Sequence, residues 1–190
     1  MSRGMRRREL RALLKAWGCD TRGVAAVEFA FIAPILILLY FGMVEFCQAY
    51  MAQKRTGHVA SVVADLVTQT DALTKQQVLD LLDVGEVIIS PFPKVELRQR
   101  VSSVSRVTST KYNIDWSVGK GLTGKLTVTD AEVPSDMLAI GESVIVAEAE
   151  YDYRSPFSNM LPEAIRIAPT FKRMAYLRPR TAEIIACTGC

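Results

Sequence analysis

The sequence Arg22-Gly23-Val24-Ala25-Ala26-Val27-Glu28-Phe29, with the apolar run behind it, decides how the rest of the chain is organised. From Phe29 to Val44 no residue is charged, and Glu28 and Glu45 bound this run. The stretch from Gly23 to Tyr50 extends about 42 Å as an α-helix, at 1.5 Å per residue. The hydrocarbon core of a bilayer is about 30 Å thick. The sequence therefore predicts a transmembrane helix over residues 24–50.

The leader, residues 1–23, is strongly basic: seven arginines and lysines stand against two acidic residues. Basic residues beside a span favour the cytoplasmic side, and Lys54 and Arg55 weaken this asymmetry without reversing it. We therefore expect a single-pass protein of the bacterial inner membrane, with a cytoplasmic leader and a periplasmic C-terminal domain. Since the whole chain carries a net charge of +3 and the leader about +5, the basic balance belongs to the leader. It does not indicate nucleic-acid binding.

Glu28 lies about one and a half turns inside the predicted helix. A carboxylate at the centre of the hydrocarbon costs about 2.5–3.5 kcal/mol, and less near the interface. One interpretation is a helix that starts at Phe29 and leaves Glu28 among the lipid headgroups. The other is a carboxylate that enters the membrane because it has a charged partner, and the neighbouring residues favour this second interpretation.

A basic leader, a glycine, four small or apolar residues, a glutamate, an aromatic residue and an apolar helix together resemble the class III signal of type IV pilins. The resemblance implies that a prepilin peptidase cuts between Gly23 and Val24. Glu28 then becomes the fifth residue of the mature chain. Its implied role, with Phe29 beside it, is in subunit assembly, where the carboxylate pairs with the free α-amino group of a neighbouring subunit.

The similarity extends further along the helix, to Pro34, the leucine-rich run after it, and Gly42-Met43-Val44-Glu45. The whole pattern resembles the TadE/TadG-like family of tight-adherence (Flp) pilus assembly proteins. About 30 residues carry it. The resemblance implies a pseudopilin or minor pilin that works with the prepilin peptidase, other pilins and pseudopilins, and the pilus assembly platform. Pro34 lacks a backbone donor, so we expect it to kink the transmembrane helix.

Beyond the membrane the helix is expected to continue, as a periplasmic extension over residues 51–70. Apolar residues recur there at helical period: Val59, Val62, Val63, Leu66 and Val67. The result is a helix of roughly 45 residues whose second half packs on the soluble domain. The Thr74–Gln77 pair predicts the capping box of a second, short helix, with Gly85 as its stop.

The chain from 71 to 190 predicts a periplasmic α+β domain with a small antiparallel sheet, in a pilin-like arrangement. Alternating residues indicate strands near 95–104, 114–118, 145–153 and 171–177, with a bulge near Ser102-Ser103. We expect Glu148, Glu150 and Asp152 to lie on a solvated face. A loop is expected for most of 156–169, and the strand at 171–177 is expected to be the last.

Four cysteines are present, and two of them form Cys187-Thr188-Gly189-Cys190 at the chain end. In an oxidising periplasm we expect a disulfide loop, with an unpaired tail as the alternative. Metal binding is disfavoured because two cysteines and the distant, single His58 supply too few ligands. No set of residues predicts catalysis, and no cofactor is implied.

Three functions follow. The favoured one is a cleaved pseudopilin of a tight-adherence pilus. The second is an uncleaved, single-pass envelope protein with a periplasmic binding domain, in which Gly23 and Glu28 have no special role. The third is a periplasmic thiol enzyme that uses Cys187 and Cys190, for which the surrounding pattern gives little support.

Overall fold

The computed structural model describes residues 23–129, 133–134, 137–156 and 168–190. The expected basic leader up to residue 22 and most of the loop expected at 156–169 lie outside these ranges. The chain divides into two compact units, Met1–Val44 and Glu45–Cys190, and each is described by itself.

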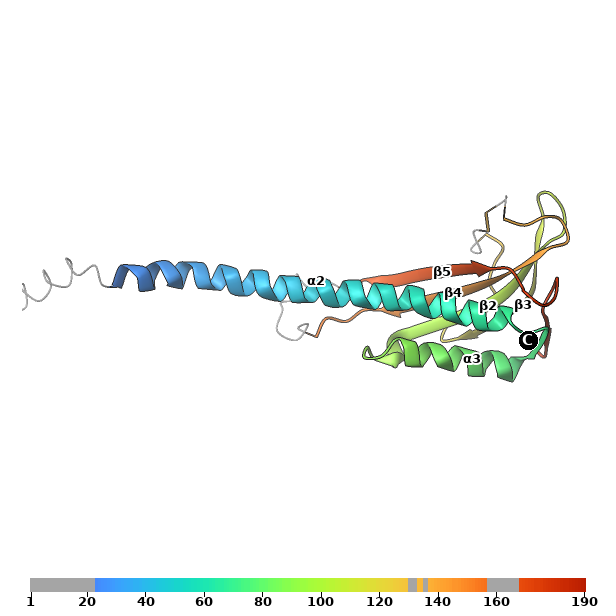
Figure 1. Cartoon of the computed structure of the whole chain (residues 1–190), viewed down its shortest axis with the longest axis horizontal. Coiled ribbons are helices and arrows are strands. Elements are labelled where there is room, and N and C mark those ends of the chain that lie inside the picture. The colour runs from blue at the N-terminus through green and yellow to red at the C-terminus, as the bar shows by residue number, and fades with distance from the viewer. Residues whose placement is uncertain (1–22, 130–132, 135–136, 157–167) are drawn as a thin grey trace, which may run out of the picture. The chain divides into compact units, whose positions relative to one another are not determined.

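The longest element is helix α2, Val24–Thr68, which has 45 residues, as the sequence predicts. It runs through Pro34 and past the end of the apolar run (Figure 1). Its first 21 residues belong to the first unit and the remainder to the second.

Within the second unit, one stripe of α2 packs into the hydrophobic core. The stripe repeats every three or four residues and consists of small or β-branched residues: Ala49, Ala52, Thr56, Val59, Ala60, Val63, Ala64 and Val67. Short side chains allow the helix backbone to approach the sheet closely. The predicted apolar stripe is confirmed for Val59, Val63 and Val67, which are fully buried.

The second helix, α3, spans Lys75–Ile88 and starts with the predicted capping box between Thr74 and Gln77. The predicted stop at Gly85 is wrong, because α3 continues for three residues beyond it. Gly85 instead lies under Gln99, whose amide nitrogen donates to the Leu82 carbonyl at 2.9 Å. A Cβ atom at Gly85 would be 2.0 Å from the Gln99 side-chain oxygen. The glycine is there for close packing, not for ending the helix.

Four strands form the main sheet, in the order β3-β2-β4-β5 and antiparallel throughout. Their bounds are β2 Leu97–Arg106, β3 Tyr112–Lys120, β4 Ser143–Asp152 and β5 Thr170–Leu177. The predicted bulge is present as a register shift between Ser103 and Val104. Val95, predicted to begin the first strand, lies instead in the short 3-10 helix η2 (Lys94–Glu96) and is exposed.

A long apolar helix with a four-stranded antiparallel sheet confirms the predicted α+β, pilin-like class. One end of the second unit is marked by a contact between α2 and the segment after β5. Arg180 N–H donates to the carbonyl of Thr68, the last residue of α2, so the ends of β5 and α2 lie together. Figure 1 shows the two helices on the same side of the sheet.

The chain end forms a further strand that the sequence does not predict. Strand β6, Ala186–Thr188, pairs in parallel with β1, Ala72–Thr74, as a separate two-stranded sheet. Ile185, just before it, is fully buried, and its carbonyl accepts a 2.7 Å hydrogen bond from the Trp116 indole. The expectation that 171–177 is the last strand is therefore wrong.

Candidate functional site in the apolar half of the long helix

The candidate processing site lies where α2 begins. Gly23 directly precedes the first helical residue, Val24, and both are exposed. A Cβ atom added to Gly23 would meet no atom within 4 Å, and its backbone is outside the left-handed region. Neither packing nor backbone conformation therefore requires a glycine at this position.

Glu28 projects from the first turns of α2 and is exposed, as is Phe29, with 67% of its surface accessible. Among the described residues Glu28 has no ion-pair partner. Its surroundings on the helix are apolar: Val24, Val27, Phe31 and Ile32 are all exposed large hydrophobic residues. A carboxylate on such a surface is available to a positively charged group from another molecule.

The apolar surface continues along the described part of the first unit, residues 23–44. In the described chain, α2 is the helix long and apolar enough to cross a membrane, and its most apolar window makes no buried contact. Gly42 is also free of neighbours, since an added Cβ atom would meet nothing within 4 Å. Glycine costs about 1 kcal/mol relative to alanine inside a helix. The fold of the described chain offers no compensation for that cost.

Pro34 lies inside α2, and the helix continues on both sides of it. Proline has no N–H group, so the carbonyl of Ala30, four residues earlier, lacks its usual helical donor. The bend expected there remains a prediction.

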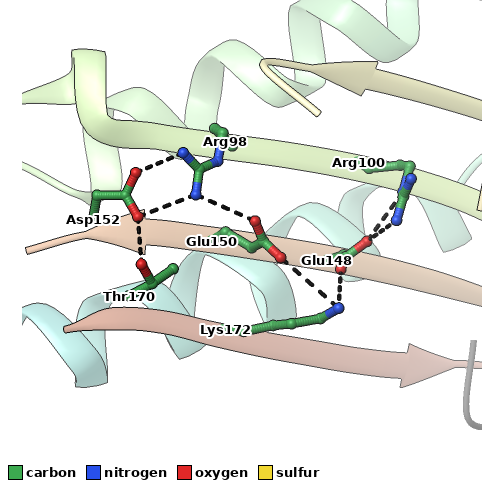
Figure 2. Close-up of polar contacts among 7 residues, drawn as sticks. All are labelled: Arg98, Arg100, Glu148, Glu150, Asp152, Thr170 and Lys172. Carbon is green, nitrogen blue, oxygen red and sulfur yellow. Dashed lines mark hydrogen bonds and ion pairs between the residues drawn. The ribbon is translucent and has the colours of Figure 1, made fainter. Parts of the chain in front are cut away.

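A second cluster of charge lies on the sheet face opposite the helices. Ala147, Ala149 and Tyr151 of β4 point into the core, so the alternating residues Glu148, Glu150 and Asp152 point to the other face. Figure 2 shows them interleaved with Arg98, Arg100, Lys172 and Thr170 from the neighbouring strands.

In this ladder of ion pairs each carboxylate has a cationic partner. Glu148 accepts from Arg100 Nε at 3.0 Å and lies 2.7 Å from Lys172 Nζ. Arg98 binds Asp152 at 2.6 Å and Glu150 at 3.4 Å. The expectation of a solvated face is wrong for Glu148, whose side chain is 2% exposed, because β4 lies between two strands that carry basic residues.

The ladder shifts the titration of its members. The Thr170 hydroxyl, followed by Arg98, holds the pKa of Asp152 below its usual value. The hydrogen bond to Glu148 raises the pKa of Lys172. Three cations balance three anions, which leaves no surplus negative charge to attract a metal ion. Within the described ranges there is no group of three or more residues suited to hold one.

The remaining candidates belong to the second unit. Cys187 and Cys190 are joined by a disulfide at the chain end, and His58 is exposed on α2. The structure brings the two cysteines together, but they belong to a different unit from Gly23 and Glu28.

Sequence reasoning gave no role to Glu45, which the structure places in contact with Ser155. The sequence pattern that predicts burial of Glu45 is the spacing of three or four residues, which continues from Thr56 through Ala52 and Ala49 back to Glu45.

Comparison with known proteins gives a match for Gly23 and most of helix α2. Residues 23–65 match the model of the family described as TadE-like protein. The matched region begins at Gly23 and covers Glu28, Pro34 and Glu45. Neither a curated protein nor a solved structure gives a match to the chain. Proteins of the matched family are structural components and not catalysts. Over residues 23–65 the chain is thus similar to TadE-like proteins.

Proposed function

We propose that the protein is a pseudopilin or minor pilin of a tight-adherence pilus, made as a precursor and cut by a prepilin peptidase between Gly23 and Val24. The observation that carries this proposal is a glycine and a glutamate that the fold does not need. Among the described residues Gly23 has no neighbour that forbids a side chain, and Glu28 has no ion-pair partner on its exposed apolar helix. Both residue types are those that a processing enzyme and a neighbouring subunit would recognise.

The proposal includes a topology. Residues 1–23 form a cytoplasmic leader, 24–50 a transmembrane helix whose membrane-embedded part ends before Glu45, 51–70 its periplasmic extension, and 71–190 the periplasmic domain. The exposed apolar surface of the first unit supports the span, since water does not favour so large a continuous apolar surface. The basic leader supports the orientation. In an oxidising periplasm the Cys187–Cys190 disulfide would persist and hold the chain end in a closed loop.

In assembly, we expect the transmembrane helices to bundle and Glu28 to pair with the α-amino group that cleavage creates on a neighbouring subunit. The ion pair compensates for the cost of a carboxylate in hydrocarbon. It also sets the axial register of one helix against the next. Phe29 beside it contributes apolar contact to the same interface.

The decisive experiment is the mass and N-terminal sequence of the membrane-extracted protein from cells with and without a prepilin peptidase. A start at Val24 that depends on the peptidase supports the proposal. An intact leader in both cells contradicts it and favours the uncleaved envelope protein.

Substitutions test the cleavage position and the assembly carboxylate separately. Gly23→Leu should block cleavage. Gly42→Ala, at a glycine inside α2 that likewise meets no described neighbour, should be cut normally. Glu28→Ala should leave membrane insertion and cleavage intact but impair pilus assembly. Normal pili from Glu28→Ala would contradict the role of the ion pair.

A further inference from the structure

Glu45 ends the uncharged run and is also the first residue of α2 in the second unit. It continues the stripe that packs on the sheet, four residues before Ala49 and seven before Ala52. Those positions are otherwise small or apolar. A carboxylate at this end of the stripe therefore needs a specific partner, because burying a charge without one is costly.

Ser155 supplies that partner from the other side of the packing interface. Its hydroxyl donates to Glu45 Oε2 at 2.7 Å, across 110 residues of sequence. Ser155 follows β4 by three residues and is itself buried. A hydrogen bond to a charged acceptor is about twice as strong as a neutral one.

The second oxygen of the carboxylate faces a similar requirement. Among the described residues neither Glu45 Oε1 nor the hydroxyl of Tyr153 has a hydrogen-bond partner, although both atoms are buried. Burial, and then the nearby Glu45 carboxylate, raise the pKa of the Tyr153 hydroxyl, which therefore keeps its proton. One group lacks a donor and the other lacks an acceptor, and they lie in the same corner of the domain.

The surroundings make this corner rigid enough to position the carboxylate. The Tyr153 ring contacts those of Phe92 and Phe171, with centroids 6.4 and 6.1 Å away. The backbone N–H of Tyr153 donates to the Pro169 carbonyl at 3.0 Å. The chain between Tyr153 and Ser155 is thus anchored by ring packing on one side and by a backbone bond on the other.

We propose that Glu45 is a positioning residue that latches the sheet onto α2 at the helix-start end of the domain, through Ser155 and Tyr153. The opposite end is held by the Arg180–Thr68 backbone bond, and the apolar stripe lies between the two. With both ends tied, the sheet follows the helix when the helix moves along its axis. The latch concerns the folded domain alone, so it stands or fails independently of cleavage and pilus assembly.

Hydrogen exchange of the full-length protein in detergent tests the latch. Glu45→Ala should speed exchange of the Tyr153 amide at least tenfold, while amides of central strand β2 such as Val101 keep their wild-type rate. Glu45→Gln keeps an acceptor for Ser155 and should stay within about threefold of wild type. Gln53→Ala, on the same helix, is the matched control and should change neither amide.

A double variant separates a latch from a general loss of packing. Glu45→Ala with Ser155→Ala should exchange no faster at Tyr153 than the faster of the two single variants, because both remove the same bond. The proposal is overturned if Glu45→Ala leaves the Tyr153 amide unchanged, if Tyr153 and Val101 speed up alike, if the Gln variant behaves like the Ala variant, or if the two single effects multiply.

Discussion

The two halves of α2 are built from similar apolar residues but give them opposite surroundings. Before Glu45, Val27 and Leu36 expose 56% and 54% of their surface, whereas Val63 in the second half exposes 1%. Helical propensity does not separate the halves, because both form one continuous helix. What separates them is the presence of a sheet that covers the second half. The first half has no such cover within the described chain.

The glycines and carboxylates repeat this contrast. At Gly85 an added Cβ atom would clash with Gln99, whereas at Gly23 and Gly42 it would meet none of the described residues within 4 Å. Glu148 is buried between Arg100 and Lys172, whereas Glu28 is exposed and has no ion-pair partner in the part of the chain that the structure describes. Contacts within the second unit explain Gly85 and Glu148. Among the described residues no contact explains Gly23 or Glu28 in the first unit.

The largest expected effect comes from placing a charge in each half of α2. Val63→Asp buries an unpaired carboxylate and should destabilise the second unit by more than about 4 kcal/mol, a large part of a typical domain's stability. Leu36→Asp should leave the denaturant midpoint in detergent unchanged. It should reduce membrane insertion instead, because an acidic residue at the bilayer centre costs about 2.5–3.5 kcal/mol.

Circular dichroism during denaturant unfolding measures the first quantity, and alkaline extraction of membranes measures the second. If Leu36→Asp destabilised the protein in detergent as much as Val63→Asp, the two halves of α2 would not differ in burial.

An intermediate effect is expected from the glycines. Gly85→Ala should destabilise by up to about 2 kcal/mol, since overpacking costs about 1–3 kcal/mol and alanine returns about 1 kcal/mol of helix propensity. Gly42→Ala should be neutral or stabilising by up to about 1 kcal/mol. Thermal unfolding of the full-length protein compares the two. Equal midpoints for both variants would show that Gln99 moves aside without cost.

The smallest effect concerns the ion ladder and pH. The pKa of Asp152 is lower in the folded state than its usual value of 3.8, so the ionised carboxylate stabilises the fold. This contribution is complete above about pH 4, the range of the unfolded pKa, and is lost as the pH falls through that value toward the lower, folded-state pKa. Asp152 and Arg98 are both about one-third exposed, so solvent screening keeps the effect small.

We therefore expect Asp152→Asn to lower the unfolding midpoint slightly at pH 7 and to flatten its fall between about pH 5 and pH 3. Lys75→Gln, at the start of α3 and outside the ladder, is the control and should leave the shape of the pH profile unchanged. A pH profile in Asp152→Asn as steep as in the wild type would mean that other carboxylates account for the acid sensitivity.

Local patterns along the chain were enough to predict the length of α2, the capping box at Thr74, the bulge after Ser103 and the four strands of the main sheet. Each of these depends on residues within a few positions of one another, through helical period, side-chain-to-backbone bonds or strand alternation. The same is true of the family pattern from Gly23 to Glu45, whose meaning lies in order and spacing.

Other features depend on contacts between residues far apart in the sequence, so local patterns do not predict them. Gly85 reads as a helix stop until Gln99 is seen lying against it. Glu148 reads as a solvated residue until two flanking strands bring Arg100 and Lys172 to it. Strand β6 has only three residues, and its partner β1 lies more than 100 residues earlier, so no local pattern predicts it. Which segments are helical, extended or apolar can be predicted from the sequence, since those properties depend on neighbouring residues. The fold decided which charges and glycines are buried, because burial depends on what arrives from elsewhere in the chain.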